Sequence, residues 1–432
     1  MPALKTPPAI RMSLLGGHSC GIIKKMIKNG HDMTLNAPRC HRKTDLPKRM
    51  LHIFLLAAIL LGVPALCAAF FGPPGIWEGV KSFPPRTEDW GMRPEALWNY
   101  RCPFSWPWFI GYALFTFACI FPLVKRAATN PTAKPSNRQT VKLSNRFPWW
   151  GWFGIVELAV AWVFCWAKFD FCREIQPHIS YMPVWIGYIL IVNALCVLRS
   201  GSSPLTAHPL PYLLTFPASA LFWWFFEYLN RYVWNWYYLG VSQMGPGEYA
   251  FYATICFSSV LPAVTATAAL LHTFAPFDDA RFADLKPVKM RDWRTVALLG
   301  GVSALGLTGI VLIPQYTFPL LWLSPLFVFL LIQSLLGEPC ILEQAGGRNW
   351  SLVLRFACAA LVCGLCWETW NYYAVAKWVY AVPLVHRFQI WEMPLIGFAG
   401  YLPFGVECAA VTAWIYPDLI EAEPSKGEDS GQ

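Results

Sequence analysis

The stretch TVALLGGVSALGLTGIVLIPQYTFPLLWLSPLFVFLLIQSLLG (residues 295–337) contains no Asp, Glu, Lys or Arg. A helix rises about 1.5 Å per residue and the hydrocarbon core of a bilayer is about 30 Å thick, so this run is too long for a single crossing. Pro314 and Pro319 interrupt the run, and proline ends or kinks a helix. The run therefore predicts two membrane helices, at 295–313 and 320–337.

The rest of the chain has the same apolar character. Of its 432 residues, 56% are hydrophobic and only 14% are charged, whereas soluble domains carry about 25% charged residues. This composition excludes a disordered chain and a disulfide-rich secreted module. We therefore predict an all-α polytopic integral membrane protein of about ten transmembrane helices. The other eight helices are expected at 51–71, 106–124, 148–168, 182–198, 210–231, 249–272, 352–373 and 391–415.

Basic residues are concentrated in three segments outside the expected helices, namely 1–50, 125–147 and 273–294. With ten helices these segments all lie on one face, which the positive-inside rule identifies as the cytoplasmic face. We therefore expect cytoplasmic termini and a location in the plasma membrane, with the inner membrane of a bacterium as the favoured case. The net charge of +9 has the same explanation, so membrane lipid is the expected partner and nucleic acid is not. The sequence predicts no oligomeric state.

The first expected helix, 51–71, allows two interpretations. Translation could start at Met50 rather than Met1, and the run 51–71, which follows Lys48 and Arg49 in the sequence, could then be a signal peptide. Its apolar stretch is longer than the usual core of a signal peptide, so an uncleaved membrane anchor is favoured.

The chain contains a candidate internal duplication. At a fixed spacing of 141 residues, 211–270 aligns without gaps to 352–411 with 12 identities in 60 positions. Two four-helix repeats would then run parallel around an axis along the membrane normal; the alternative is convergent composition of aromatic-rich helices. The expected parts are a basic arm (1–50), a helix pair (51–125) with an outer loop (72–105), repeat 1 (148–272), a cytoplasmic linker (273–294), repeat 2 (295–415) and an acidic tail (416–432).

The clearest polar motif is E-x-x-N, which occurs in FFEYLNRY (225–232) and CWETWNYY (366–373). Residues three apart share one face of a helix, so Glu227 lies beside Asn230 and Glu368 beside Asn371. Both glutamates are expected near the outer leaflet, where an unpaired carboxylate is costly. Their expected partners are nearby cations or a histidine: Arg231, Lys377, His386 and Arg387.

Three interpretations of this motif stay open. Glu227 and Glu368 could be acid/base groups of a site between the repeats, with Asn230 and Asn371 orienting them. The same side chains could instead join neighbouring helices by hydrogen bonds. They could also reach the aqueous interface from the aromatic belt.

Three further acids lie in or beside the expected helices. Glu392 begins the helix at 391–415, and capping of its first turn is the favoured role. Glu157 and Glu407 lie within helices, where each could belong to a proton path or form one hydrogen bond between helices.

The cysteines and aromatic clusters give weaker signals. Cys363-x-x-Cys366 lies inside an apolar helix and is interpreted as helix packing. Cys102 and Cys172 fall in outer loops, where a disulfide is possible. The cluster YVWNWYY (232–238) is typical of interfacial anchors, although such rings could also bind sugars, lipids or prenyl chains.

No phosphate-binding loop, zinc-protease motif, nucleophile elbow or dinucleotide fingerprint occurs, so we expect no cofactor and no metal. The favoured hypothesis is a membrane-embedded enzyme that acts on a lipid or isoprenoid-type substrate near the outer leaflet, with Glu227 and Glu368 as the working acids. The alternatives are a secondary transporter or channel-like protein with a proton-linked acid path, and a non-catalytic scaffold or assembly factor.

Overall fold

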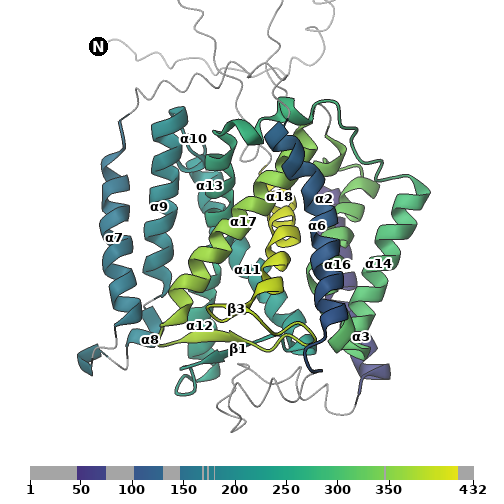
Figure 1. Cartoon of the computed structure of the whole chain (residues 1–432), viewed down its shortest axis with the longest axis horizontal. Coiled ribbons are helices and arrows are strands. Elements are labelled where there is room, and N and C mark those ends of the chain that lie inside the picture. The colour runs from purple at the N-terminus through teal and green to yellow at the C-terminus, as the bar shows by residue number, and fades with distance from the viewer. Residues whose placement is uncertain are drawn as a thin grey trace, which may run out of the picture. The chain divides into compact units, whose positions relative to one another are not determined.

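The computed structural model describes residues 46–73, 102–129, 146–167, 170–172, 175–179, 181–344 and 347–416. These residues are mostly helical (Figure 1), and eight of their helices are long and apolar enough to cross a membrane. The prediction of an all-α membrane protein is confirmed at this level. The eight helices are Leu46–Phe71 (α2, η2 and α3), Trp106–Thr129 (α6), Trp149–Trp166 (α7), Tyr181–Ser200 (α9), Pro246–His272 (α12 and α13), Trp293–Leu312 (α14), Arg348–Tyr372 (α17) and Leu395–Ile415 (η9 and α18).

Two further helices lie in expected regions, α11 (Pro209–Val233) and α16 (Leu320–Leu335). The break within 295–337 is also present, because Pro314 begins the short helix α15 (Pro314–Thr317) and Pro319 precedes α16. Since α16 has only 16 residues, a total of ten crossings stays a prediction. The remaining short helices are η5 (Asp170–Cys172), α8 (Gln176–Ile179), α10 (Pro204–Ala207), η6 (Ala275–Phe277), η7 (Asp279–Phe282) and η8 (Ile341–Glu343).

The helix expected at 391–415 begins later than predicted. Residues 389–394 form a hairpin of two short strands, β3 (Gln389–Ile390) and β4 (Met393–Pro394), joined by Trp391 and Glu392. Trp391 has a φ of 54°, which suits a tight turn and not a helix. The prediction that Glu392 caps a first helical turn is therefore wrong, because this residue lies in the turn of the hairpin.

The segment expected as one helix at 249–272 is broken in its middle. Helix α12 (Pro246–Phe257) ends before Ser258 and Ser259, and α13 (Val260–His272) follows. Ser219 of α11 bridges this break, since its hydroxyl donates to the carbonyl of Phe257 (2.6 Å) and accepts from the amide of Leu261 (3.0 Å). A polar side chain thus satisfies backbone groups that no water reaches inside a bilayer.

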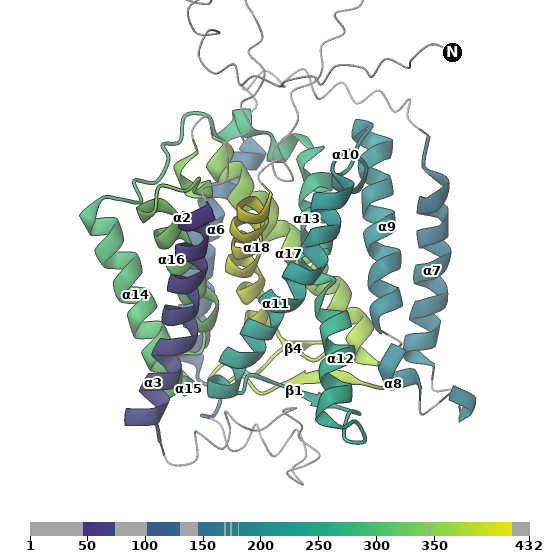
Figure 2. The same ribbon diagram turned by 180° about the vertical axis from the view of Figure 1, so that it is seen from behind.

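Two strands absent from the all-α prediction close one end of the helix bundle. β1 (Trp236–Leu239) follows α11 and β2 (Lys377–Tyr380) follows α17, and they pair antiparallel with Trp236 opposite Tyr380 and Tyr238 opposite Trp378. This sheet lies at the end where α11 and α17 finish, opposite the start of α2 (Figures 1 and 2).

The expected clustering of basic loops on one face is supported where the structure describes them. Arg126 at the end of α6 donates to the carbonyl of Arg281 (3.0 Å) and pairs with Asp284. Arg281 in turn donates to the carbonyl of Ala127 (2.8 Å). The start of loop 125–147 therefore lies against 273–294, and the assignment of this face to the cytoplasm stays a prediction. The structure does not describe residues 1–45, 74–101, 130–145 and 417–432. The possible Cys102–Cys172 disulfide also lies outside the described side chains.

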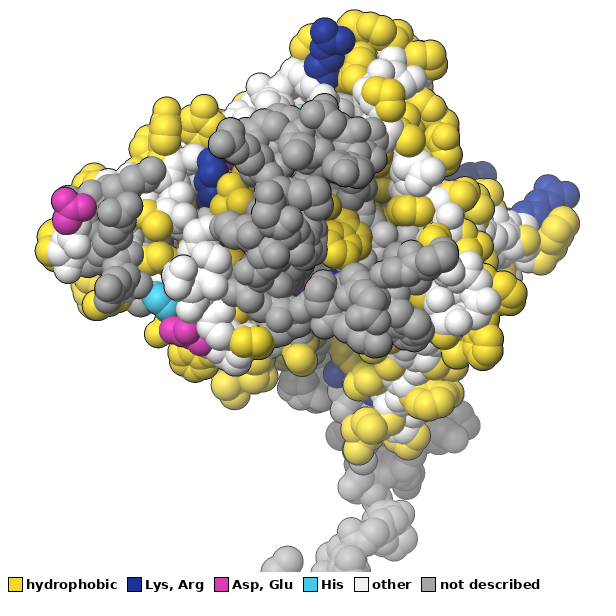
Figure 3. Space-filling view, turned by 90° about the horizontal axis from the view of Figure 1, so that it is seen from below, with side chains coloured by type: hydrophobic (Ala, Val, Ile, Leu, Met, Phe, Trp, Pro, Cys, Tyr) yellow, Lys and Arg dark blue, Asp and Glu magenta, His cyan; other side chains and the backbone are white. Residues whose placement is uncertain are grey.

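The first helix is an integral part of the bundle. His52 of α2 is fully buried, and its Nδ1 contacts the carboxylate of Glu338, which also accepts from the indole of Trp414 (3.0 Å). This packing favours an uncleaved anchor over a signal peptide. Large apolar side chains on α6, α7 and α14 face outward, and hydrophobic side chains surround much of the perimeter at the strand-bearing end (Figure 3). Such a surface fits lipid contact.

Close packing of α17 against α18 depends on Gly405. A Cβ at this position would lie 2.1 Å from the carbonyl oxygen of Phe356, so Gly405→Ala is expected to cost about 1–3 kcal/mol through overpacking. The matched control is Gly301→Ala in α14, where no atom lies within 4 Å of the added Cβ. The midpoint of thermal unfolding in detergent, followed by tryptophan fluorescence at one heating rate, should fall only for Gly405→Ala. Equal midpoints for the two variants would contradict this packing.

Candidate functional site

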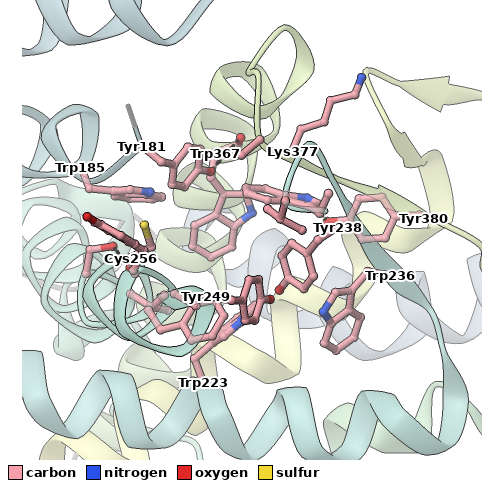
Figure 4. A pocket seen from close by; sticks show the side chains of 18 of the residues that line it. Tyr181, Trp185, Trp223, Trp236, Tyr238, Tyr249, Cys256, Trp367, Lys377 and Tyr380 are labelled. Atoms are coloured by element: carbon pink, nitrogen blue, oxygen red, sulfur yellow. Dashed lines mark hydrogen bonds between the residues drawn. The ribbon is translucent and has the colours of Figure 1, made fainter. Parts of the chain in front are cut away.

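A cavity of about 170 Å³ lies beside the β1–β2 sheet, and half of its 26 lining residues are Trp, Tyr or Phe. The lining residues come mainly from helices α8, α9, α11, α12, α13, α16, α17, η9 and α18 and from strands β1, β2 and β4. Figure 4 draws part of this lining. Among the described residues that line it there is no Asp or Glu, and Lys377 and His178 are the only lining side chains that can carry positive charge. Its six tryptophans are Trp185, Trp223, Trp236, Trp322, Trp367 and Trp378.

Glu227 lies behind this wall near the end of α11, and it is only 2% exposed. One carboxylate oxygen, Oε1, accepts from the indole nitrogens of Trp223 (3.1 Å) and Trp236 (2.9 Å) and from the hydroxyl of Tyr238. The other oxygen, Oε2, is buried and has no hydrogen-bond partner among the described residues. The three donors come from α11 and β1.

Glu368 has the same arrangement near the end of α17, where it is fully buried. Its Oε1 accepts from the hydroxyls of Tyr380 (2.5 Å) and Tyr401 (2.8 Å) and from the indole nitrogen of Trp378 (3.4 Å). Within the described part of the chain its Oε2 also lacks a partner. Each glutamate therefore holds three aromatic donors on one oxygen and leaves the second oxygen unbonded.

All six of these donors line the cavity, whereas neither glutamate does. The polar edge of each ring therefore faces a carboxylate. This arrangement places Glu227 and Glu368 one layer behind the cavity surface, where they position the rings. The two carboxylates share no donor, so they do not form a directly paired dyad.

Asn230 and Asn371 hold the strands rather than the glutamates. The amide nitrogen of Asn230 donates to the carbonyl of Trp236 (2.9 Å), and its oxygen accepts from the amide of Asn235 (2.8 Å). Asn371 exchanges both bonds with the backbone of Trp378, at 2.8 and 2.9 Å. In each case the asparagine fixes the strand whose tryptophan and tyrosine donate to the neighbouring glutamate. The expected orienting role is thus indirect.

The expected partners of the glutamates are placed elsewhere. Lys377 pairs with Glu392 (2.5 Å) and donates to the carbonyl of Tyr372. Arg387 lies over the rings of Phe104, Trp106 and Phe388, at 5.1 to 6.0 Å. Arg231 is buried one turn beyond Glu227, and no ion pair between them occurs among the described residues.

His386, the fourth expected partner, also lies elsewhere. Its ring contacts the amide of Gln389 at 2.8 Å. Burial lowers the pKa of His386 to about 4, so its imidazole is uncharged at neutral pH.

The other intramembrane acids lie apart from the cavity wall. Glu157 is half-buried on α7, and Glu407 is buried on α18. Neither lines the cavity, and neither has a hydrogen bond within the described residues. Cys363 is fully buried in α17 near Tyr188 and Thr267, and no group of three possible metal ligands occurs among the described residues.

The residues that sequence inspection missed are the aromatic donors themselves, above all Tyr238, Tyr380 and Tyr401. A signal for them exists, because each E-x-x-N is followed by a W-x-Y, at 236–238 and 378–380. Burial, with the negative charge of Glu227 beside it, raises the pKa of Tyr238 well above its ordinary value. Burial and Glu368 raise the pKa of Tyr380 in the same way. Both phenols therefore stay protonated donors at physiological pH.

Replacement of Asn371 should loosen strand β2, because its side chain holds the backbone of Trp378. Asn371→Leu leaves the backbone N–H and carbonyl of Trp378 without partners, which is expected to cost about 1–3 kcal/mol. Near-UV circular dichroism should then lose intensity, because Trp378 and Tyr380 are no longer held in one orientation. Thr369→Val on the same helix is the control, since that hydroxyl bonds only to the carbonyl of Leu365 in its own helix. An unchanged spectrum and stability for Asn371→Leu would contradict the clamp.

Comparison with known proteins identifies no relative, since no family model, no curated protein and no solved structure matches the chain.

Proposed function

We propose that this protein is a membrane-embedded enzyme that binds a lipid or isoprenoid-type substrate in the aromatic cavity. The observation that carries the proposal is the cavity wall, in which six aromatic side chains that line the space donate hydrogen bonds to two buried glutamates. Such a wall favours a hydrocarbon, because burial of apolar surface contributes about 25 cal/mol per Å². A sugar would need hydrogen-bond partners that this wall has already engaged.

The position of the cavity suits a substrate that arrives from the bilayer. It lies at the bundle end opposite the face where Arg126 meets the linker 273–294 (Figures 1 and 2). If that face is cytoplasmic, the cavity opens near the outer leaflet of the plasma membrane. The apolar outer surface of α6, α7 and α14 supports membrane lipid as the surrounding medium.

The acid/base role of the glutamates is indirect in this proposal. The hydroxyls of Tyr238, Tyr380 and Tyr401 lie between the carboxylates and the cavity. A tyrosine hydroxyl can take a proton from a group in the cavity while it passes its own proton to the carboxylate, so that the carboxylate acts as a general base through the phenol. Glu227 and Glu368 are then positioning residues, and the tyrosines are the residues that would touch substrate.

A second candidate, a proton-linked transporter, is favoured by Glu407 alone. This carboxyl is buried in α18 without a hydrogen bond in the described part of the chain, and intramembrane acids often mark proton paths. A transporter also requires polar groups that continue to both faces. The cavity wall is apolar at its centre, so the enzyme remains the proposal that the geometry supports better.

A bulky side chain in the cavity should exclude the substrate. Val260 lines the cavity without donating any side-chain hydrogen bond, and Val260→Trp fills space with little change to the glutamate networks. We expect lipid extracted from the purified protein, measured by mass spectrometry, to fall at least about fivefold relative to wild type. The control is Ile255→Trp, which places the same ring on an exposed position of α12. Equal lipid content in both variants would argue against a lipid site here.

The proposed chemistry is tested by removing one hydroxyl. Tyr380→Phe keeps the ring but deletes the donor to Glu368, and loss of general acid/base catalysis costs about 10²–10⁴-fold in rate. In cells that overproduce each variant, lipid profiling should show the product of the wild-type protein lost with Tyr380→Phe and retained with Tyr252→Phe. Tyr252 lines the same cavity and bonds neither glutamate. Retention of the product in both variants, with both folded, would rule out this hydroxyl as the catalytic donor.

A further inference from the structure

The electrostatic character of the cavity follows from what lies behind its rings. Neither Glu227 nor Glu368 has an ion pair with a Lys, Arg or His among the described residues. Arg231 lies one turn beyond Glu227 on α11, and Glu392 is paired with Lys377 (2.5 Å). The aromatic hydrogen bonds are therefore the contacts through which each carboxyl acts on the cavity.

When a carboxyl is ionised, the hydrogen bonds that it accepts make the donor rings richer in electrons. An aromatic ring has a negative face and a positive edge, and an indole N–H or phenol O–H that donates to a carboxylate is polarised by it. Around Glu368 the bonds form chains, because Trp378 donates to Tyr380 (2.8 Å) and Trp367 donates to Tyr401. Both tyrosines then donate to the same carboxylate oxygen.

No cation of the protein occupies this space among the described residues. The Lys377 ammonium points away from the rings (Figure 4) and is held by Glu392. His178, at the other side of the lining, contacts Glu248 at 3.0 Å. The two lining side chains that can carry positive charge are thus each held by an acid outside the Glu368 network.

From this geometry we propose that the cavity binds an organic cation, an alkylated ammonium group attached to a hydrocarbon chain. Cation–π attraction is strongest where the cation is desolvated against several rings, and the two buried carboxylates add to it without touching the ligand. This inference rests on the proposed lipid-binding function and names its ligand class. The shared chemistry is the alkylammonium group, whether it belongs to a lipid headgroup or to a free small cation.

The test compares two ligands of equal shape and different charge. Hexyltrimethylammonium and 2,2-dimethyloctane differ only in a positively charged nitrogen in place of a carbon, and tetramethylammonium supplies the head alone. Binding to the purified full chain is followed by tryptophan fluorescence. We expect hexyltrimethylammonium to bind at least about tenfold more tightly than its neutral analogue.

The variants locate the preference for the cation. Glu368→Gln is expected to reduce it to less than about threefold, and Glu227→Gln is expected to reduce it as well, because each variant removes a carboxylate to which three lining rings donate. Glu157→Gln on α7, away from the cavity, should leave it unchanged. If Glu368→Gln does not fold, Trp378→Phe keeps an aromatic ring at this position and removes the indole N–H that donates to Glu368 and Tyr380, so the preference should still fall.

The outcomes separate this inference from the proposed function. Equal binding of the charged and neutral ligands overturns the cation site and leaves the hydrocarbon site standing. Failure of both ligands to bind overturns both proposals. Binding of tetramethylammonium as tight as that of hexyltrimethylammonium supports the cation site and assigns it to a small free cation, whereas weaker binding assigns it to a chain-bearing lipid. A preference that survives in both Glu368→Gln and Trp378→Phe overturns the role of the carboxylate.

Discussion

The structure depends on the cost of a buried carboxylate. Removal of an ion from water costs several kcal/mol unless strong hydrogen bonds replace its hydration. Glu227 and Glu368 receive three such bonds each, and the donors cannot all come from the glutamate's own helix. The chain must therefore turn back after α11 and after α17, so that a tryptophan and a tyrosine of the following strand reach the carboxylate. The strands β1 and β2 supply four of the six aromatic donors.

The same requirement shapes the cavity. Rings whose polar edges are fixed behind the wall cannot rotate freely, so their faces stay directed at one space. Asn230 and Asn371 add to this by holding the backbone of the strands, and antiparallel pairing of Trp236 with Tyr380 sets the two networks side by side. The result is a preorganised apolar site whose shape depends on polar interactions outside it.

Sequence patterns predicted the helices well and the partners of the acids poorly. Hydropathy and Pro314 located the break within 295–337, because these signals are local. The E-x-x-N motif was also visible. Its partners were sought among Arg231, Lys377 and Arg387 because opposite charges attract, yet neutral donors satisfy a buried carboxylate without a second buried ion. The four-residue strands give little periodic signal, and the turn at Trp391 and Glu392 looks like a helix start because Pro394 follows it.

The cavity lining also bears on the proposed duplication. The spacing of 141 residues that aligns the two halves relates Cys256 to Gly397, Ser259 to Gly400, and Val260 to Tyr401, and all six residues line the cavity. β1 and β2 pair antiparallel, as a local twofold axis would relate them, and the duplication stays a prediction. The paired residues differ in size, however, so the two sides of the cavity are unlike. The two glutamate networks also differ, because Trp223 donates to Glu227 from the same helix, whereas Tyr401 donates to Glu368 from α18.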